Sequence, residues 1–89
     1  MNILLLTQDN CHFCDMAKEI LDRLAVEYGF TLFTLDLNSA RGQALALEGG
    51  VLFPPGIFIN GEPFGYGRPS EKRLRRELEQ RIPRTSRVR

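Results

Sequence analysis

The first 28 residues change their hydrophobic period once, at Cys11, and this change restricts the fold more than any other feature of the chain. The run "NILLL" at 2–6 is continuously apolar over the length of a strand, which is typical of a strand buried on both faces. After "TQDN", apolar residues recur at helical spacing, and Gly29 follows as the predicted C-terminal cap. The apolar positions of this helix are Ala17, Ile20, Leu21, Leu24 and Tyr28. A strand, a helix and a further strand predict a right-handed crossover and a parallel strand pair.

The rest of the chain predicts three more strands and two more helices. "TLFTLDL" is rich in β-forming residues, "EGG" ends a helix, and "NGE" at 60–62 indicates a tight hairpin. The predicted elements are a strand at 31–37, a helix from Asn38 or Ser39 to about 47, strands at 57–60 and 63–66, and a helix at 68–82 that Ser70 caps and Pro83 ends. The order β-α-β-α-β-β-α predicts an α/β fold in which helices flank a four-stranded mixed sheet.

The length of 89 residues predicts one domain at 1–82, followed by a flexible basic C-terminal tail at 83–89. Two cysteines are too few for the disulfide scaffold of a small secreted protein. The N-terminal apolar run is shorter than the roughly 7–15 residues of a signal-peptide core, and nothing approaches the ~20 apolar residues of a membrane span. We therefore expect a cytoplasmic monomer in a reducing compartment, where a lone cysteine pair is more often redox-active or metal-binding than structural.

Charge is distributed unevenly, although the formal net charge is only +1. Residues 68–89 contain nine Lys and Arg and three Glu, whereas residues 1–67 contain three Lys and Arg and eight Asp and Glu. We interpret the basic end as a solvated helix and tail; the alternative is a docking surface for an acidic partner or an anionic small molecule. The basic run contains no interleaved aromatic residues on which bases could stack, so we expect no nucleic acid partner. We also expect no membrane partner.

The two cysteines, Cys11 and Cys14, form a C-x-x-C motif where the predicted helix begins. A free cysteine has a pKa of about 8.5, and a helix N-terminus can lower the pKa to roughly 3.5–7.5, because unpaired N–H groups stabilise the thiolate. Cys11 lies at the helix edge and is the predicted exposed nucleophile. Cys14 lies one turn inside and is the predicted shielded, resolving thiol. It would attack a mixed disulfide on Cys11, release the reduced substrate and leave a bridge between the two cysteines.

Other interpretations of the pair are weaker. A purely structural bridge would close only a tiny loop and add little stability. A zinc ion would need two further ligands, but the chain has a single histidine and no other cysteine, so we expect no metal site. The histidine, His12, lies inside the motif; as imidazolium it would stabilise the thiolate and make the pair more oxidising, and the equal alternative is that it merely lies in solvent. Phe13 is a predicted substrate contact, because the apolar face of the helix begins only at Ala17.

Three segments together resemble the glutaredoxin-like branch of the thioredoxin superfamily: "CHFC" after the first strand, "FPPGIFING" at 53–61, and a final helix that opens after "FGYG". The resemblance covers essentially residues 1–82. It implies a thioredoxin-like fold of the glutaredoxin type and a thiol-disulfide oxidoreductase that serves electron transport and cell redox homeostasis. Its substrates would be protein disulfides or glutathione mixed disulfides. No cofactor would be tightly bound, and glutathione as co-substrate or a reductase would supply the electrons.

The resemblance also implies site residues outside the motif. In this family a cis-proline precedes the third strand and faces the cysteines, which predicts a cis bond between Pro54 and Pro55. The usual residue at position 54 is Val, whose N–H pairs with the substrate; Pro54 lacks this donor. Many relatives carry a Lys shortly before the first cysteine, and this chain has Gln8 there.

A second group is implied by the segment that holds the γ-glutamyl end of glutathione in relatives. Its Gly-Gly and Asp pair appear here only loosely, as Gly65-Tyr66-Gly67 and then Ser70-Glu71. The N-terminus of the last helix could bind a carboxylate, assisted by Arg68 or Lys72. The candidate binding residues are Gly67, Arg68, Ser70 and Glu71.

Two further functions remain open. Some glutaredoxins without Pro inside the motif hold a [2Fe–2S] cluster between two subunits, with the first cysteine of each and two glutathiones. This chain also lacks that Pro. The other function is a binding module, in which the basic last helix docks on a partner and the cysteine pair regulates the contact.

Overall fold

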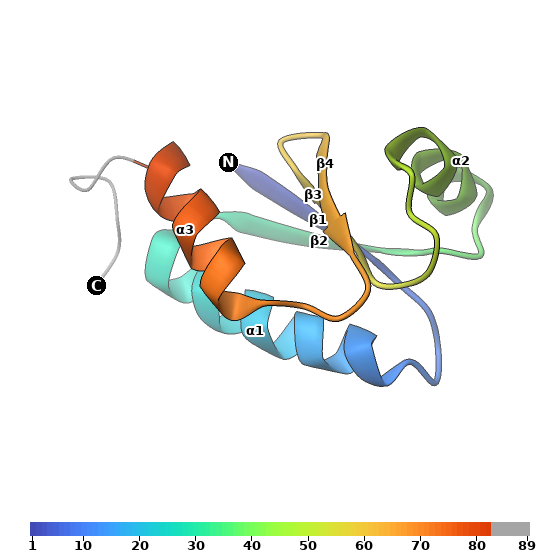
Figure 1. The fold of residues 1–89 in the computed structure, drawn as a ribbon, viewed down its shortest axis with the longest axis horizontal. Helices are drawn as coiled ribbons and strands as arrows, with labels where there is room; N and C mark the ends of the chain where they lie inside the picture. The colour runs from blue at the N-terminus through green and yellow to red at the C-terminus, as the bar shows by residue number, and fades with distance from the viewer. Residues whose placement is uncertain (83–89) are drawn as a thin grey trace.

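A computed structural model describes residues 1–82 of the chain. The predicted tail at 83–89 lies outside the described residues. The elements follow the predicted order (Figure 1). They are β1 (Asn2–Thr7), α1 (His12–Tyr28), β2 (Thr31–Asp36), α2 (Ala40–Gly49), β3 (Gly56–Ile59), β4 (Glu62–Tyr66) and α3 (Glu71–Arg81). Helix α2 ends two residues later than predicted, because its C-cap is Gly50, which adopts a left-handed conformation with φ 69°.

The sheet has four strands in the order β2-β1-β3-β4. Strands β1 and β2 are parallel, whereas β3 is antiparallel to both β1 and β4, which confirms the predicted mixed sheet. The hairpin between β3 and β4 turns through Asn60 and Gly61, whose φ angles of 51° and 83° are both positive, as a type I′ turn requires. The register pairs Leu6 near the end of β1 with Gly56 at the start of β3, so the loops next to these residues leave the same edge of the sheet.

Helices cover both faces of the sheet, as predicted (Figure 1). Helices α1 and α3 lie on one face, and α2 lies on the other. The larger core lies under α1 and α3; its fully buried side chains include Ile3, Leu5, Leu21, Leu24, Ile59, Leu74 and Leu78. The smaller core under α2 is built on Leu6, Ala46 and Phe58. Within residues 1–82, no helix is long and apolar enough to cross a membrane.

Polar contacts at the surface fasten α3 to α1. The Arg75 guanidinium bonds Glu27 of α1 at 2.7 Å and Glu71 of its own helix at 3.1 Å, and Glu71 also pairs with Arg23 of α1. The Tyr28 hydroxyl donates to Glu79 at 2.8 Å, and burial together with this bond raises the pKa of Tyr28. These contacts join α3 to the C-terminal half of α1.

Candidate active site

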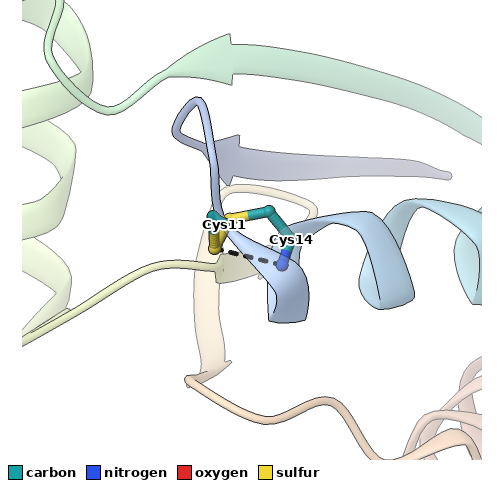
Figure 2. The surroundings of a disulfide bond; sticks show 2 residues. All are labelled: Cys11 and Cys14. Atoms are coloured by element: carbon teal, nitrogen blue, oxygen red, sulfur yellow. Dashed lines mark hydrogen bonds between the residues drawn. A yellow bond between two sulfur atoms is a disulfide. The ribbon is translucent and has the colours of Figure 1, made fainter.

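Cys11 is the N-cap residue of α1. Strand β1 ends at Thr7, and the loop at 8–10 turns through Asn10, whose φ is 56°. Cys11 itself is extended, with φ −118° and ψ 105°, and its Sγ accepts the backbone N–H of Cys14 at 3.1 Å (Figure 2). A sulfur therefore takes the place of the side-chain oxygen that usually caps a helix. The same N–H would bind a Cys11 thiolate and stabilise it.

A disulfide joins Cys11 and Cys14, so the structure shows the oxidised form of the pair (Figure 2). Their Cα atoms are 5.1 Å apart, within the usual range for bridged cysteines, because the motif folds into the cap and first turn of α1. Cys14 is only 3% exposed, whereas Cys11 is half-buried. Cys14 is thus the more shielded cysteine, as expected, whereas Cys11 is half-buried rather than exposed.

The two residues inside the motif both lie at the surface. Phe13 is 36% exposed and its ring centroid lies 6.2 Å from that of His12, which is also exposed. Within residues 1–82, no hydrogen bond links the imidazole to Cys11. The exposure of Phe13 agrees with the expected substrate contact, and that contact and any effect of His12 on the thiolate stay predictions.

The proline segment lies at the same edge of the sheet as the cysteines. The bond between Pro54 and Pro55 is cis, which confirms the prediction from the family resemblance. Pro55 is fully buried and directly precedes Gly56, the partner of Leu6 at the end of β1. In Figure 2 the segment that leads into β3 runs beside Cys11, and in Figure 1 the same loop lies close to the start of α1. The Pro55 carbonyl accepts the Gly67 N–H at 2.8 Å, which ties the end of β4 to this segment.

Two aromatic residues, Phe53 and Tyr66, lie close in sequence to the hydrogen bond between Gly67 and Pro55. The rings of Phe53 and Tyr66 meet edge to face, with centroids 5.1 Å apart and an angle of 87° between their planes. Both are substantially exposed, Phe53 by 51% and Tyr66 by 40%. Gly67 makes room for the Phe53 ring, because a Cβ at this position would lie 2.6 Å from Phe53 Cε2.

The comparison with known families agrees with this geometry. The family described as Glutaredoxin matches residues 3–64, which include both cysteines, Phe53 and the Pro54–Pro55 pair. The chain belongs to the glutaredoxin family. It is a thiol-disulfide oxidoreductase with a C-x-x-C pair.

Several known proteins are similar to this glutaredoxin. A probable thioredoxin of Methanothermobacter thermautotrophicus is 31% identical over 74 residues, which cover 83% of this chain and 87% of that protein. A probable thioredoxin of Archaeoglobus fulgidus is 31% identical over 71 residues, 80% of this chain and 78% of that protein. The solved structure of a mutant thioredoxin from Halobacterium salinarum has a TM-score of 0.71 at 24% identity, covering 92% of this chain and 74% of that one, and it supports the shared fold.

The structure gives different surroundings to the four residues predicted to hold a glutathione carboxylate, which are Gly67, Arg68, Ser70 and Glu71. The Ser70 hydroxyl accepts the Arg73 N–H at 3.2 Å, so it caps α3 as predicted. The Glu71 carboxylate is turned to Arg23 and Arg75, whose hydrogen bonds lower its pKa. Arg68 is exposed and has no ion-pair partner among residues 1–82. The structure therefore leaves Gly67 and Arg68 next to the proline segment and gives Glu71 a contact with α1.

Sequence reasoning did not single out Phe53 and Tyr66 as site residues. Their positions carried a hint, because each is an aromatic residue directly beside a predicted site residue, in "FPPG" and "GYG". Only the fold shows that the two segments are joined and that the rings touch.

Proposed function

We propose that this glutaredoxin reduces disulfides of proteins, and mixed disulfides of glutathione, by a two-cysteine route. The Cys11 thiolate attacks one sulfur of the substrate disulfide, and the other sulfur leaves as a thiolate that takes a proton. Cys14, as thiolate, then attacks Cys11 Sγ and releases the second substrate thiol. The substrate gains two electrons and two protons, and the enzyme is left with the bridge between its cysteines. The observation that carries this proposal is the half-buried Cys11, whose Sγ accepts the Cys14 N–H and is bridged to a buried Cys14.

The helix start supports the order of attack. The N–H of Cys14 and the positive end of the α1 dipole both favour negative charge on Cys11 Sγ. Cys11 is therefore the better-stabilised thiolate, and it is also the more exposed residue of the two. Buried Cys14 reaches only Cys11, which restricts it to the resolving step.

We propose that a thiol reductant regenerates the pair, either two glutathione molecules, which become glutathione disulfide, or a dithiol reductase. Arg68, exposed and without an ion-pair partner in the described chain, supports contact with a carboxylate such as those of glutathione. We further propose that the protein works as a monomer in the cytoplasm, without a tightly bound cofactor, in electron transport and cell redox homeostasis.

The route is tested by single cysteine replacements in an assay of protein disulfide reduction. Cys11→Ser is expected to abolish turnover. Cys14→Ser is expected to stop the resolving step, so that a mixed disulfide with Cys11 accumulates and is seen by mass spectrometry. Turnover by Cys11→Ser at the rate of the parent would contradict the proposal.

The electron donor is decided by two coupled assays with the parent protein. One supplies glutathione and glutathione reductase, and the other supplies thioredoxin reductase. The donor that sustains NADPH oxidation in the presence of a protein disulfide is the one the enzyme uses. Anaerobic reconstitution with iron and sulfide, with Cys11→Ser as control, provides a separate check: visible absorbance that depends on Cys11 would favour cluster carriage over disulfide reduction.

A further inference from the structure

The proposed reaction makes no use of the exposed aromatic pair Phe53–Tyr66. Other exposed apolar side chains, such as Val26, Phe33 and Leu47, lie on separate elements. Single exposed apolar residues are normal on protein surfaces, whereas a joined apolar surface indicates an interaction site. Phe53 and Tyr66 are joined through their ring contact, and the neighbouring Leu52 is also exposed, by 77%.

The backbone beneath the two rings is held rigidly. Phe53 precedes a proline, which restricts its backbone to extended conformations. Tyr66 ends β4, and the next residue, Gly67, donates its N–H to the Pro55 carbonyl at 2.8 Å. The pair is therefore ordered before a ligand arrives, which lowers the entropy cost of binding.

The pair lies at the edge of the sheet where substrates meet Cys11. Phe53 is two residues from Pro55, and Pro55 adjoins the strand position that pairs with Leu6 at the end of β1. The loop at 8–10 connects that strand end to Cys11. On the cysteine side of this edge, the Phe13 ring is also exposed. A disulfide bound at Cys11 thus has aromatic surface close to the residues that flank it.

The backbone of the same segment offers little to an extended peptide. Pro54 and Pro55 have no N–H, and the Pro55 carbonyl is already bonded to Gly67. Of the two proline carbonyls, that of Pro54 is left without a hydrogen bond from residues 1–82. Discrimination between substrates in this region therefore falls to the side chains.

We propose that the Phe53–Tyr66 pair determines substrate specificity by contacting an apolar or aromatic side chain next to the substrate cysteine. The inference rests on the proposed disulfide reduction and names its preferred substrate class: protein disulfides flanked by apolar residues, ahead of polar ones such as glutathione mixed disulfides. An apolar neighbour buries area against the two rings, and an aromatic neighbour adds attraction beyond that area, whereas a polar neighbour offers neither.

The test uses two short peptides that each carry one cysteine joined to cysteamine, identical except for Phe or Ser beside that cysteine. Pre-reduced enzyme reacts with each peptide in a single turnover, and mass spectrometry gives the second-order rate constant for its reduction. We expect the Phe peptide to react faster by about threefold to tenfold, the size expected for one aromatic contact. Phe53→Ala and Tyr66→Ala should each reduce this ratio, and the double variant should bring it close to one.

Two further variants separate the ring contact from other causes. Tyr66→Phe keeps the ring and should keep the ratio. Phe33→Ala removes a ring of equal exposure, 50%, from β2 on the far edge of the sheet and should also keep it. Circular dichroism checks that every variant is folded, which is expected because all three rings are exposed.

A ratio near one in the parent would overturn the inference while leaving disulfide reduction intact. The inference would also be overturned if the double variant kept the rate ratio of the parent, or if Phe33→Ala or Tyr66→Phe also brought that ratio close to one. If the parent reduces neither peptide, the proposed function itself fails, and the inference fails with it.

Discussion

Gly67→Ala should be unusually destabilising for a single added methyl group. Gly67 has a φ of 80°, in the left-handed region that residues with a Cβ disfavour. The new methyl group would also lie 3.1 Å from Phe53 Cζ, which is a tight contact, and 2.6 Å from Phe53 Cε2, which is closer than carbon atoms approach in folded proteins. The substitution thus combines a backbone cost with a steric one.

The two costs can be estimated separately. The left-handed conformation costs about 1–2 kcal/mol for a residue with a Cβ. The steric conflict is with the far end of a half-exposed ring, so the ring can turn away, at the loss of its edge-to-face contact with Tyr66, worth about 0.5–1.5 kcal/mol. Together they should lower the free energy of unfolding by about 2–3 kcal/mol, or the melting temperature by about 10–20 °C for a domain of this size.

Urea unfolding of the oxidised protein, followed by far-UV circular dichroism, measures this loss. Gly61→Ala is a matched control, because Gly61 has a φ of 83° but nothing within 4 Å of an added Cβ, so it should show the backbone cost alone. Phe53→Ala removes the steric part, so Gly67→Ala introduced into the Phe53→Ala variant should lower the stability of that variant by no more than Gly61→Ala lowers that of the parent. Equal losses for Gly67→Ala and Gly61→Ala, or additive losses in the double variant, would refute the placement of the ring over Gly67.

Three further predictions concern the scaffold. A hydrogen bond from Arg75 lowers the pKa of Glu27, and hydrogen bonds from Arg23 and Arg75 lower the pKa of Glu71, both below the usual 4.5. Their contribution to stability is complete above pH 4.5 and is lost as the pH falls through the lowered pKa values. In urea titrations at a series of acidic pH values, the free energy of unfolding of Arg75→Met should therefore fall less with pH than that of the parent. Ser70→Ala removes the N-cap of α3 and should cost about 1 kcal/mol in urea titrations; a loss under a few tenths would argue against the cap. Leu74→Ala leaves a cavity under α3 and should cost about 2–5 kcal/mol, which calorimetry can measure.

The order of elements and the position of the cysteines were predictable because each depends on local pattern. The change of period at Cys11 marks the start of a helix wherever that helix packs, and the cap geometry follows from it. The positive φ angles of Gly29 and Gly50 likewise satisfy local C-cap requirements. The cis bond before Pro55 was predictable only through family resemblance, since most X-Pro bonds are trans.

The parts of the site that sequence reasoning missed depend on contacts between distant residues. Glu71 was predicted as a ligand contact because Ser70-Glu71 loosely matches the Asp pair of relatives, and nothing local indicated that its carboxylate bonds Arg23, which is 48 residues away. Likewise, nothing local in "FPPG" or "GYG" indicates that Phe53 and Tyr66 touch. Their contact follows from the tie between Pro55 and Gly67, which forms only when β3 and β4 are paired in register.

The same tie couples stability to specificity, which leads to a last prediction. If Gly67→Ala turns the Phe53 ring away from Tyr66, it should also lower the preference for the Phe peptide over the Ser peptide, although it changes no ring and no cysteine. Gly61→Ala, of similar backbone cost, should leave that preference unchanged, because the β3–β4 hairpin turn lies at the opposite end of β4 from Tyr66. Peptide rate constants measured for both variants at a temperature where each is fully folded decide the matter. A preference that Gly67→Ala retains in full would mean that the position of the Phe53 ring over Gly67 has no part in selecting substrates.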